Sequence, residues 1–498
     1  MRPMSRTSQV LGLAAAFMVL ASEGKTLAGD QPVTAPNVIL VLTDDQGFGD
    51  LSCHGSPDVR TPNIDRLHRE SVRFTDFQAS PTCSPTRAAI MTGYAPFKGG
   101  VTHTIHERER LVLKYTTIAQ QLKALGYATG IFGKWHLGDE DAYQPGRRGF
   151  DEVFVHGAGG IGQRFSGSAA DAPDNTYFSP VIRHNGTFVR TRGFCTDVFF
   201  RQALGWIKQQ QKDARPFFAY ISTNAPHSPY VAPDKYTKRF AAAGYGKAAQ
   251  GDYGMVENID DNMGLLMRKL DEWNLSGNTV LIFMSDNGKA QFRNKEPLGR
   301  NAVPDTYNAG MKGYKGSVNE GGTRVPLFVR WPGRMTAGTD VPAMASHYDI
   351  FPTLIEMAGG RAPEAIDGRS LVPLIQGRAA DWSGMTYRFV HKGRWNPGEN
   401  PDDYKYQTFA VRNERFRLIN NEELYDVKVD RGEQDNVIKL HPEVAQKMMA
   451  AYNAWWDEVR PQMVNESGGN EILEPPYVLE YNRQTKARGI PEWMPPEL

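Results

Sequence analysis

Charged and polar side chains follow four apolar stretches of the chain, at the point where each stretch ends. Residues 37–43 lead into two aspartates, and residues 279–285 lead into an aspartate and an asparagine. Residues 127–132 precede a lysine and a histidine, and residues 216–222 precede a further histidine. The side chains concerned are Asp44, Asp45, Lys134, His136, His227, Asp286 and Asn287. Because ligands of open α/β sheets bind outside the carboxyl ends of the strands, we expect these groups to meet in one site.

Part of this set could hold a metal ion. The oxygen donors after the first and the last of these stretches are Asp44, Asp45, Asp286 and Asn287. Such a set suits a hard divalent cation, Ca²⁺ in preference to Mg²⁺, and not zinc, which prefers nitrogen and sulfur. Carboxylates this close raise one another's pKa, so a cation between them is electrostatically reasonable. The alternative is two exposed acidic turns that are unrelated in space.

A cysteine stands at the start of a short predicted helix. Ser84 is a good N-cap, Pro85 suits the first helical position, and Gly93 is a plausible stop. Cys83 would then lie where free backbone N–H groups favour an anion, with Arg87 one turn further on the same face. The residues alone therefore predict a thiolate nucleophile of low pKa, with a buried structural cysteine as the alternative.

The elements that position these groups predict an α/β fold. Short apolar runs alternate with amphipathic helices such as 117–125 and 256–270, which favours a large, mostly parallel sheet sandwiched by helices. After Pro373 the pattern changes, and the stretch 382–401 is irregular. The short alternating segments that follow, 406–412, 416–419 and 423–426, are typical of a smaller domain of antiparallel sheet. A helix that starts at His441-Pro442 completes that domain. We place the domains at 34–378 and 379–470, and expect an irregular, proline-rich tail over 471–498.

Length and composition narrow the class of protein. The chain has 498 residues, 40% hydrophobic and 23% charged, with a net charge of +1. That balance argues against a nucleic-acid-binding protein. Residues 1–28 combine two arginines, an apolar run over 10–21 and small residues, which predicts a secretory signal peptide. The mature protein is expected to be exported, periplasmic or secreted, with no membrane span once the signal is cleaved.

Several motifs together resemble one known family. Cys83-Ser-Pro-Thr-Arg87 has the form C-x-P-x-R, and it follows Asp44-Asp45-Gln46-Gly47. Blocks at 133–138, 285–288 and 315–326 follow in the same order as in the family. The chain is thus similar to the type I sulfatases of the alkaline phosphatase superfamily over nearly its whole mature length. The resemblance implies an alkaline-phosphatase-like fold and the conversion of Cys83 to formylglycine by a formylglycine-generating enzyme or an equivalent.

The resemblance also implies a role for each site residue. The hydrated aldehyde at position 83 would be the nucleophile, with Asp286 as its base and the metal held by Asp44, Asp45, residue 83, Asp286 and Asn287. Charge on the sulfuryl oxygens would be neutralised by Arg87, Lys134, Lys315 and the metal. His227 resembles the general acid towards the leaving oxygen, and His136 the residue that takes a proton from the second hydroxyl. The reaction would turn a sulfate monoester into an alcohol and inorganic sulfate.

Simpler interpretations remain for individual residues. His227 could cap a loop, His136 could be a packed core histidine, and Lys315 could be a solvated loop lysine. Cys53 and Cys195 could pair in an oxidising compartment or stay free, and their spacing does not decide between the two.

The substrate is the least determined part of the prediction. The loops 96–110, with His103, His106 and Arg108, and 158–192 would suit a sulfated sugar at a pocket rim, or be ordinary solvated loops. We favour a carbohydrate sulfate over an aryl sulfate. The alternatives are a phosphonate or phosphate monoester hydrolase of the same superfamily, and a sulfated-glycan-binding protein without catalysis.

Overall fold

A computed structural model describes residues 35–165, 167–294, 305–382, 386–466 and 474–498 of the chain. The predicted signal peptide at 1–28 lies outside these residues. Among the helices of the described residues, none combines the length and the apolar character that crossing a membrane requires. Residues 35–498 form one compact unit.

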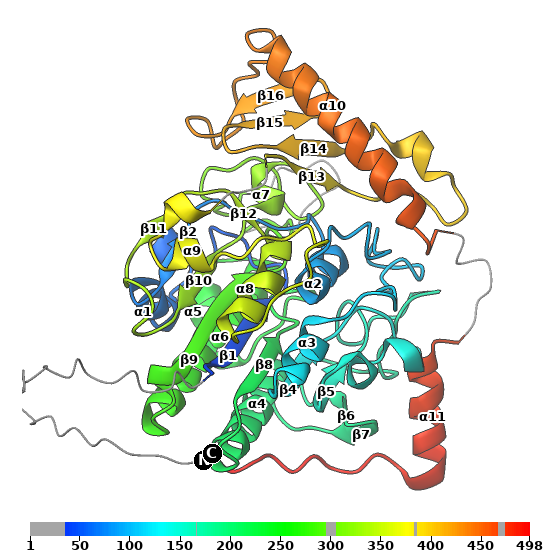
Figure 1. Ribbon diagram of the computed structural model, residues 1–498. Coiled ribbons are helices and arrows are strands. Elements are labelled where there is room, and N and C mark those ends of the chain that lie inside the picture. The colour runs from blue at the N-terminus through cyan, green and yellow to red at the C-terminus, as the bar shows by residue number, and fades with distance from the viewer. Residues whose placement is uncertain (1–34, 166, 295–304, 383–385, 467–473) are drawn as a thin grey trace, which may run out of the picture. The chain divides into compact units, whose positions relative to one another are not determined.

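A ten-stranded sheet runs through this unit, in the order β11-β2-β10-β9-β1-β8-β4-β5-β6-β7 (Figure 1). The central strands from β9 to β5 are parallel, while β10, β6 and β7 pair antiparallel towards the edges. Its strands are β1 Asn37–Thr43, β2 Val72–Phe74, β4 Ala128–Lys134, β5 Glu152–His156, β6 Val181–His184, β7 Thr187–Arg190, β8 Phe217–Ser222, β9 Thr279–Ser285, β10 Leu327–Arg330 and β11 Asp340–Val341. A separate pair joins β3 Phe77–Gln78 to β12 Ala345–Ser346. The predicted large, mostly parallel sheet is confirmed.

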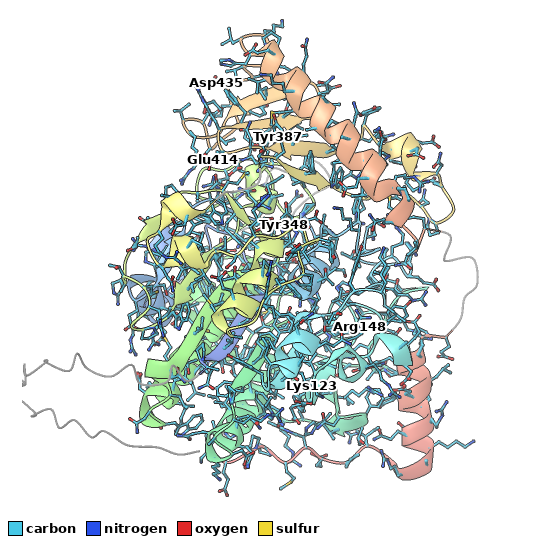
Figure 2. All side chains as sticks on the ribbon, viewed as in Figure 1. Lys123, Arg148, Tyr348, Tyr387, Glu414 and Asp435 are labelled. Atoms are coloured by element: carbon cyan, nitrogen blue, oxygen red, sulfur yellow. The ribbon has the colours of Figure 1, made fainter. Side chains whose placement is uncertain are left out.

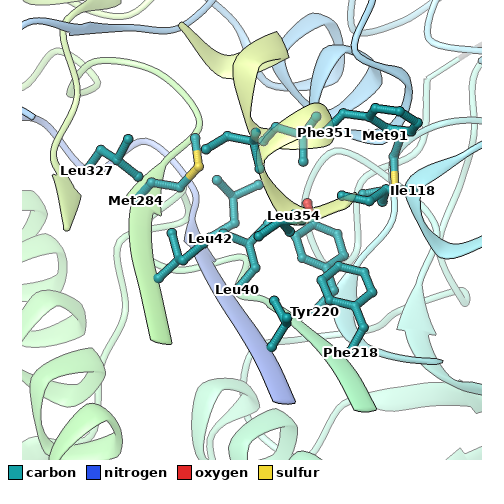
Figure 3. Close-up of a cluster of buried hydrophobic side chains, with 14 of the residues drawn as sticks. Leu40, Leu42, Met91, Ile118, Phe218, Tyr220, Met284, Leu327, Phe351 and Leu354 are labelled. Carbon is teal, nitrogen blue, oxygen red and sulfur yellow. The ribbon is translucent and has the colours of Figure 1, made fainter. Parts of the chain in front are cut away.

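The central strands are apolar throughout because both faces of the sheet are covered. Val38, Leu40 and Leu42 of β1 belong to one hydrophobic cluster, and Ile39 and Val41 belong to another on the opposite face. This split follows the two-residue period of a strand. Figure 3 shows the first cluster, in which Leu40 and Leu42 lie near Leu354 and Met284.

Helices supply the other half of each cluster. Side chains of α2, α3, α8 and α9 pack on one face of the sheet, and those of α1, α4 and α6 pack on the other. The helices of this part are α1 Pro62–Arg69, α2 Cys83–Thr92, α3 Ile118–Ala124, α4 Cys195–Lys212, α5 Asp234–Ala242, α6 Lys247–Glu272, α7 Glu320–Thr323, α8 Ile350–Met357 and α9 Val372–Ile375. The predicted helices at 117–125 and 256–270 correspond to α3 and to the second half of α6.

The four strands whose ends carry the polar side chains are neighbours in the sheet. Their order, β9-β1-β8-β4, brings all four carboxyl ends to the same edge. β1 and β9 have the predicted bounds, whereas β4 continues two residues beyond the predicted end, so that Lys134 is its last residue.

The C-terminal region forms its own four-stranded antiparallel sheet. Its strands are β13 Arg388–His391, β14 Phe409–Arg412, β15 Phe416–Ile419 and β16 Glu423–Asp426, and α10, Pro442–Val459, lies along it (Figure 1). The predicted sheet and helix are confirmed, and β13 is an additional strand in a stretch that we expected to be irregular. Figure 2 places Asp435 towards the far end of this region, with Glu414 closer to the large-sheet part and Tyr348 closer still.

The prediction of an irregular tail is wrong over residues 476–488. Residues Pro476–Arg488 form α11, with Pro476 at the helix start, where a missing N–H costs nothing. Tyr477 is buried, donates to Val155 O at 2.8 Å and packs edge-on against Phe188. The prolines mark the beginning of a helix, and contacts with the edge strands stabilise it.

Candidate active site

The strand ends and the start of α2 bring four potential ligands together. Oxygen atoms of Asp44, Asp45 and Asp286 and the sulfur of Cys83 all lie within 4.8 Å of one another, and all four residues are buried. Cys83 Sγ is 3.3 Å from Asp44 Oδ1 and 4.0 Å from Asp45 Oδ1. The Asp45 N–H donates to Asp286 Oδ1 at 3.1 Å, which links the loops after β1 and β9.

Asn287 completes the oxygen set. Its amide nitrogen donates to Asp45 Oδ1 at 2.8 Å, and its Oδ1 is buried without a hydrogen-bond partner in the described part of the chain. An unpaired buried oxygen is costly unless a ligand satisfies it. The oxygen donors therefore fit a hard divalent cation, and the sulfur of Cys83 is the one soft donor beside them.

Three basic side chains balance the three carboxylates. Lys134 Nζ lies 2.7 Å from Asp44 Oδ2, and Lys315 Nζ lies 2.7 Å from Asp45 Oδ1. Arg87 Nη2 lies 2.7 Å from Asp286 Oδ2 and also donates through Nη1 to Ser222 Oγ. The cluster is thus neutral by itself, and a divalent cation gives it a double positive charge. Such a site suits an anionic ligand.

The start of α2 differs in detail from the prediction. The helix begins at Cys83, with Thr82 as the extended residue before it, and Ser84 is not the cap. Ser84 Oγ instead donates to the carbonyl of His136 at 3.0 Å, which ties α2 to the loop after β4. Gly93 ends the helix in a left-handed conformation, as expected.

The prediction of a low-pKa thiolate is wrong for the unmodified cysteine. Burial, and then the charge of Asp44, raise the pKa of the Cys83 thiol to about 12, although Lys134 and Lys315 act in the opposite direction. The helix start cannot offset this because the thiol lies among carboxylates.

The carboxyl groups themselves differ in acidity. Burial raises the pKa of Asp286, and the neighbouring Asp44 raises it further against the effect of Arg87. Burial also raises the pKa of Asp45, but Lys315, His227 and the amide of Asn287 lower it more, so the net shift is downward. Asp286 is therefore the better proton acceptor of the two, and Asp45 is the more firmly ionised.

His136 is held through one ring nitrogen. Its Nε2 lies 2.9 Å from the carbonyl of Thr104, which can only accept, so Nε2 carries the proton. Nδ1 is then a lone-pair acceptor, and it is buried without a hydrogen-bond partner among the described residues. Burial, then Lys134, lower the pKa of His136 well below its usual value. The ring is neutral.

His227 faces the cluster with its other nitrogen. Nδ1 donates to the carbonyl of Ser228 at 2.7 Å, and Nε2 lies 3.8 Å from Asp45 Oδ2. Burial, then Lys315, lower the pKa of His227 to about 3 against the effect of Asp45. In the resting site this ring too is neutral, and Nε2 is the atom free to accept a proton.

Two further side chains have structural positions that the sequence did not reveal. Ser222, at the end of β8, accepts from Arg87, and only its position at a strand end could have pointed to it. The prediction of Arg108 as a pocket-rim residue is wrong, because Arg108 is fully buried and donates to backbone carbonyls. Cys53 and Cys195 are both free thiols.

A large, mostly parallel α/β sheet with a buried acid cluster at its carboxyl edge defines an alkaline-phosphatase-like hydrolase. Within that class the chain belongs to the sulfatase family: the family model "Sulfatase" matches residues 36–360. A second model, for the C-terminal part of N-sulphoglucosamine sulphohydrolase, matches residues 314–455. The protein is a sulfuric ester hydrolase.

Individual relatives agree with this assignment. N-acetylgalactosamine-6-sulfatase of Homo sapiens is 34% identical over 372 residues, which cover 71% of this chain and 68% of the relative. N-acetylgalactosamine-6-O-sulfatase of Bacteroides thetaiotaomicron is 28% identical and covers 89% of this chain and 98% of its own. The crystal structure of Ps i-CgsB in complex with k-i-k-neocarrahexaose has a TM-score of 0.73 and 27% identity, over 91% of this chain and 98% of that one.

Proposed function

We propose that this enzyme cleaves the sulfate ester of a carbohydrate, and that it uses formylglycine at position 83 and a bound divalent cation, Ca²⁺ in preference to Mg²⁺. The preference for a sugar is supported by the relatives: two are N-acetylgalactosamine-6-sulfatases by name, and one was crystallised with k-i-k-neocarrahexaose. N-acetylgalactosamine 6-sulfate is the first compound to test.

When present, the cation would supply positive charge against the sulfuryl oxygens, and the modified residue would supply a pair of hydroxyls in place of a thiol. Asp44, Asp45, Asp286 and the Oδ1 of Asn287 are the groups that would hold the cation. The oxygen-only set they form with an oxidised residue 83 supports Ca²⁺.

The basic side chains bind and orient the ester. Lys134 and Lys315 lie beside Asp44 and Asp45, at the same edge as residue 83, so that their ammonium groups can share a sulfuryl oxygen. Arg87 keeps Asp286 in place while its charge adds to theirs. Because these groups are already positioned, little reorganisation is needed as negative charge develops.

The proton transfers fall to three groups. Asp286, whose pKa is raised by burial, takes the proton from the attacking hydroxyl. His227 Nε2 carries the proton for the leaving oxygen, and the approach of an anionic ester favours its protonation. His136 Nδ1, the unpaired acceptor, takes the proton whose loss releases sulfate.

One observation carries the proposal: the sulfur of residue 83 lies among the oxygen donors, 3.3 Å from Asp44 Oδ1. The test is mass spectrometry of the peptide around residue 83, combined with sulfate release from N-acetylgalactosamine 6-sulfate. We expect the loss of H₂S and gain of O at residue 83, with turnover that tracks the modified fraction. An active enzyme that retains an intact thiol, or a preference for an aryl phosphonate over any sulfate, would contradict it.

Maturation and location follow from the same proposal. A formylglycine-generating enzyme or an equivalent would act on the C-x-P-x-R segment before folding, because Cys83 is only 2% exposed in the folded chain. The predicted signal peptide supports export to the periplasm or the medium, where sulfated polysaccharides are met.

A further inference from the structure

A cavity of about 400 Å³ borders the candidate active site where the large-sheet region meets the C-terminal sheet. Lys315, which pairs with Asp45, lines the cavity and joins it to the acid cluster. The other lining residues come from both regions: Gln291, Lys312, Gly316, Ser317, Val318, Asn319, Lys392, Thr408, Ile419, Asn420, Glu422 and Glu423. The C-terminal region therefore contributes directly to the surroundings of the bound ester.

Lys392 lies beside the catalytic lysine. Lys392 packs against Gly316, the residue that follows Lys315. A methyl group in place of the Gly316 hydrogen would lie 3.7 Å from Lys392 Cε. Two carboxylates also line the cavity: Glu423 is engaged by Lys312 at 3.6 Å, whereas Glu422 has no ion pair among the described residues. In the part of the chain that the structure describes, the ammonium group of Lys392 has neither an ion pair nor a hydrogen bond.

Arg394 follows Lys392 two residues later, and the backbone on both sides of it is hydrogen-bonded to a buried arginine. The buried Arg108 donates to Gly393 O and Trp395 O, both at 2.7 Å, and its guanidinium lies 4.4 Å from the centre of the Trp395 ring. Gly393 has a φ of 64° and a side chain there would strike the carbonyl of Thr102, so glycine is required. The Arg394 side chain itself is exposed and has no ion pair among the described residues.

The two side chains carry like charges two residues apart, and Lys392 brings its charge into the cavity that Lys315 also lines. Burial, then Arg394, lower the pKa of Lys392, and burial, then Arg394 and Arg108, lower the pKa of His103 to about 2. Burial lowers the pKa of Arg394 as well. Like charges held together without a partner destabilise each other, and an anionic ligand removes that cost.

We infer that Lys392 and Arg394 form a second anion-binding subsite, and that the preferred substrate carries, besides the sulfate that is cleaved, another anionic group on the same or the adjoining sugar. A uronate carboxylate and a second sulfate share this chemistry. The inference rests on the proposed function, since the subsite has meaning only beside a bound sulfated sugar. It narrows the substrate class to acidic, multiply charged glycans.

The test compares substrates that differ in their second charge. The panel is 4-nitrophenyl sulfate, N-acetylgalactosamine 6-sulfate, N-acetylgalactosamine 4,6-disulfate and a uronyl-N-acetylgalactosamine 6-sulfate disaccharide. The variants are Lys392→Gln and Arg394→Gln, with Lys439→Gln as the matched control, an exposed lysine of the same region that does not line the cavity. Melting temperatures establish that each variant is folded.

We expect the wild-type enzyme to prefer a dianionic sugar to the monosulfated one, mainly through KM. Arg394→Gln should reduce that preference by about tenfold, as the loss of one hydrogen bond to a charged group does, whereas Lys439→Gln should not alter it. The disulfate and the uronyl disaccharide distinguish the two sources of charge. Added salt should weaken the preference in the wild type more than in Arg394→Gln.

The outcomes separate the two proposals. Equal kcat/KM for singly and doubly charged sugars, or a preference unchanged in both variants, overturns the subsite. If the fully modified enzyme releases no sulfate from any compound, the proposed function fails instead. The subsite is then tested by calorimetry, which measures the binding of the disulfate to the wild type and to Arg394→Gln. Tighter binding of the disulfate by the wild type supports it, and equal binding overturns it.

Discussion

Arg87 donates two hydrogen bonds to a single oxygen of Asp286, from Nε to Oδ2 at 3.2 Å and from Nη2 to Oδ2 at 2.7 Å. The other oxygen of the carboxylate accepts from the Asp45 N–H. Both oxygens of Asp286 are thus fixed, one by α2 and one by the loop after β1. The residue that we propose as the base is held in position by the segment that carries residue 83.

The two hydrogen bonds from Arg87 to Asp286 predict that Arg87→Lys lowers kcat. The ammonium group of lysine keeps the positive charge but cannot reproduce the two N–H donors that converge on Asp286 Oδ2. We expect kcat on the preferred sulfated sugar to fall by about 100-fold, comparable to the loss of one preorganised donor, with a smaller change in KM. Arg415→Lys, at an exposed turn of the C-terminal sheet, is the control and should leave kcat unaltered. A fall confined to KM would mean that Arg87 acts only in binding.

Removal of the divalent cation should abolish activity and lower the melting temperature. The oxygen donors then lose their ligand, and Asn287 Oδ1 stays unpaired in the interior. Restoring Ca²⁺ should recover both properties, and at 100 times Kd it should add about 2.7 kcal/mol of stability. Asn287→Ala should require more Ca²⁺ for the same shift, as measured by thermal denaturation against Ca²⁺ concentration. Recovery by Zn²⁺ alone would contradict the assignment of a hard cation.

Much of the acid cluster could be predicted from the sequence because strand ends carry positional information. The apolar runs of β1 and β9 are unbroken since both faces are buried, and the residues after them necessarily lie at one edge of a parallel sheet. The acidity of Cys83 could not be predicted in this way. It depends on the burial of the thiol and then on carboxylates from distant parts of the chain, 39 residues away in the case of Asp44.

The proposed anion-binding subsite was beyond sequence reasoning for a similar reason. Arg394 lies in a stretch without periodicity, and its placement depends on Arg108, which is 285 residues from Gly393. The strand β13 was missed because it pairs with β14 across a long irregular loop and not through a short hairpin turn. Long-range hydrogen bonds, rather than local preferences, decide both features.

Glu320 is expected to be essential for stability rather than for chemistry. It is fully buried and accepts from Arg324, Arg412 and Arg417, at 2.5, 3.1 and 2.5 Å, and so connects α7 to the C-terminal sheet. Glu320→Ala leaves buried guanidinium groups uncompensated and should cost about 3–5 kcal/mol in the free energy of unfolding. Urea denaturation measures the loss. Glu414→Ala, an exposed glutamate of the same sheet labelled in Figure 2, should lie within about 0.5 kcal/mol of the wild type.

A buried glutamate in the loop before α3, Glu109, should make stability fall as pH rises. Burial raises the pKa of Glu109 from 4.5 to about 7, although the Ala169 N–H bonds its Oε1 at 2.6 Å, and its Oε2 has no hydrogen-bond partner in the described ranges. The folded state therefore keeps a proton that the unfolded state releases. The stabilisation is fully present below pH 4.5 and is lost as pH rises through 7.

This single group should account for about 3 kcal/mol of the decline over that interval. Glu109→Gln keeps an acceptor for Ala169 and needs no proton, so its free energy of unfolding should exceed that of the wild type at pH 8 and depend less on pH. Glu107→Gln removes the same charge from a glutamate that pairs with Arg110 at 2.7 Å, and it is the control. Urea denaturation from pH 5 to pH 8 measures the slopes. If the free energy of unfolding depends on pH in the same way in Glu109→Gln, Glu107→Gln and the wild type, Glu109 is ionised in the folded protein and the prediction is wrong.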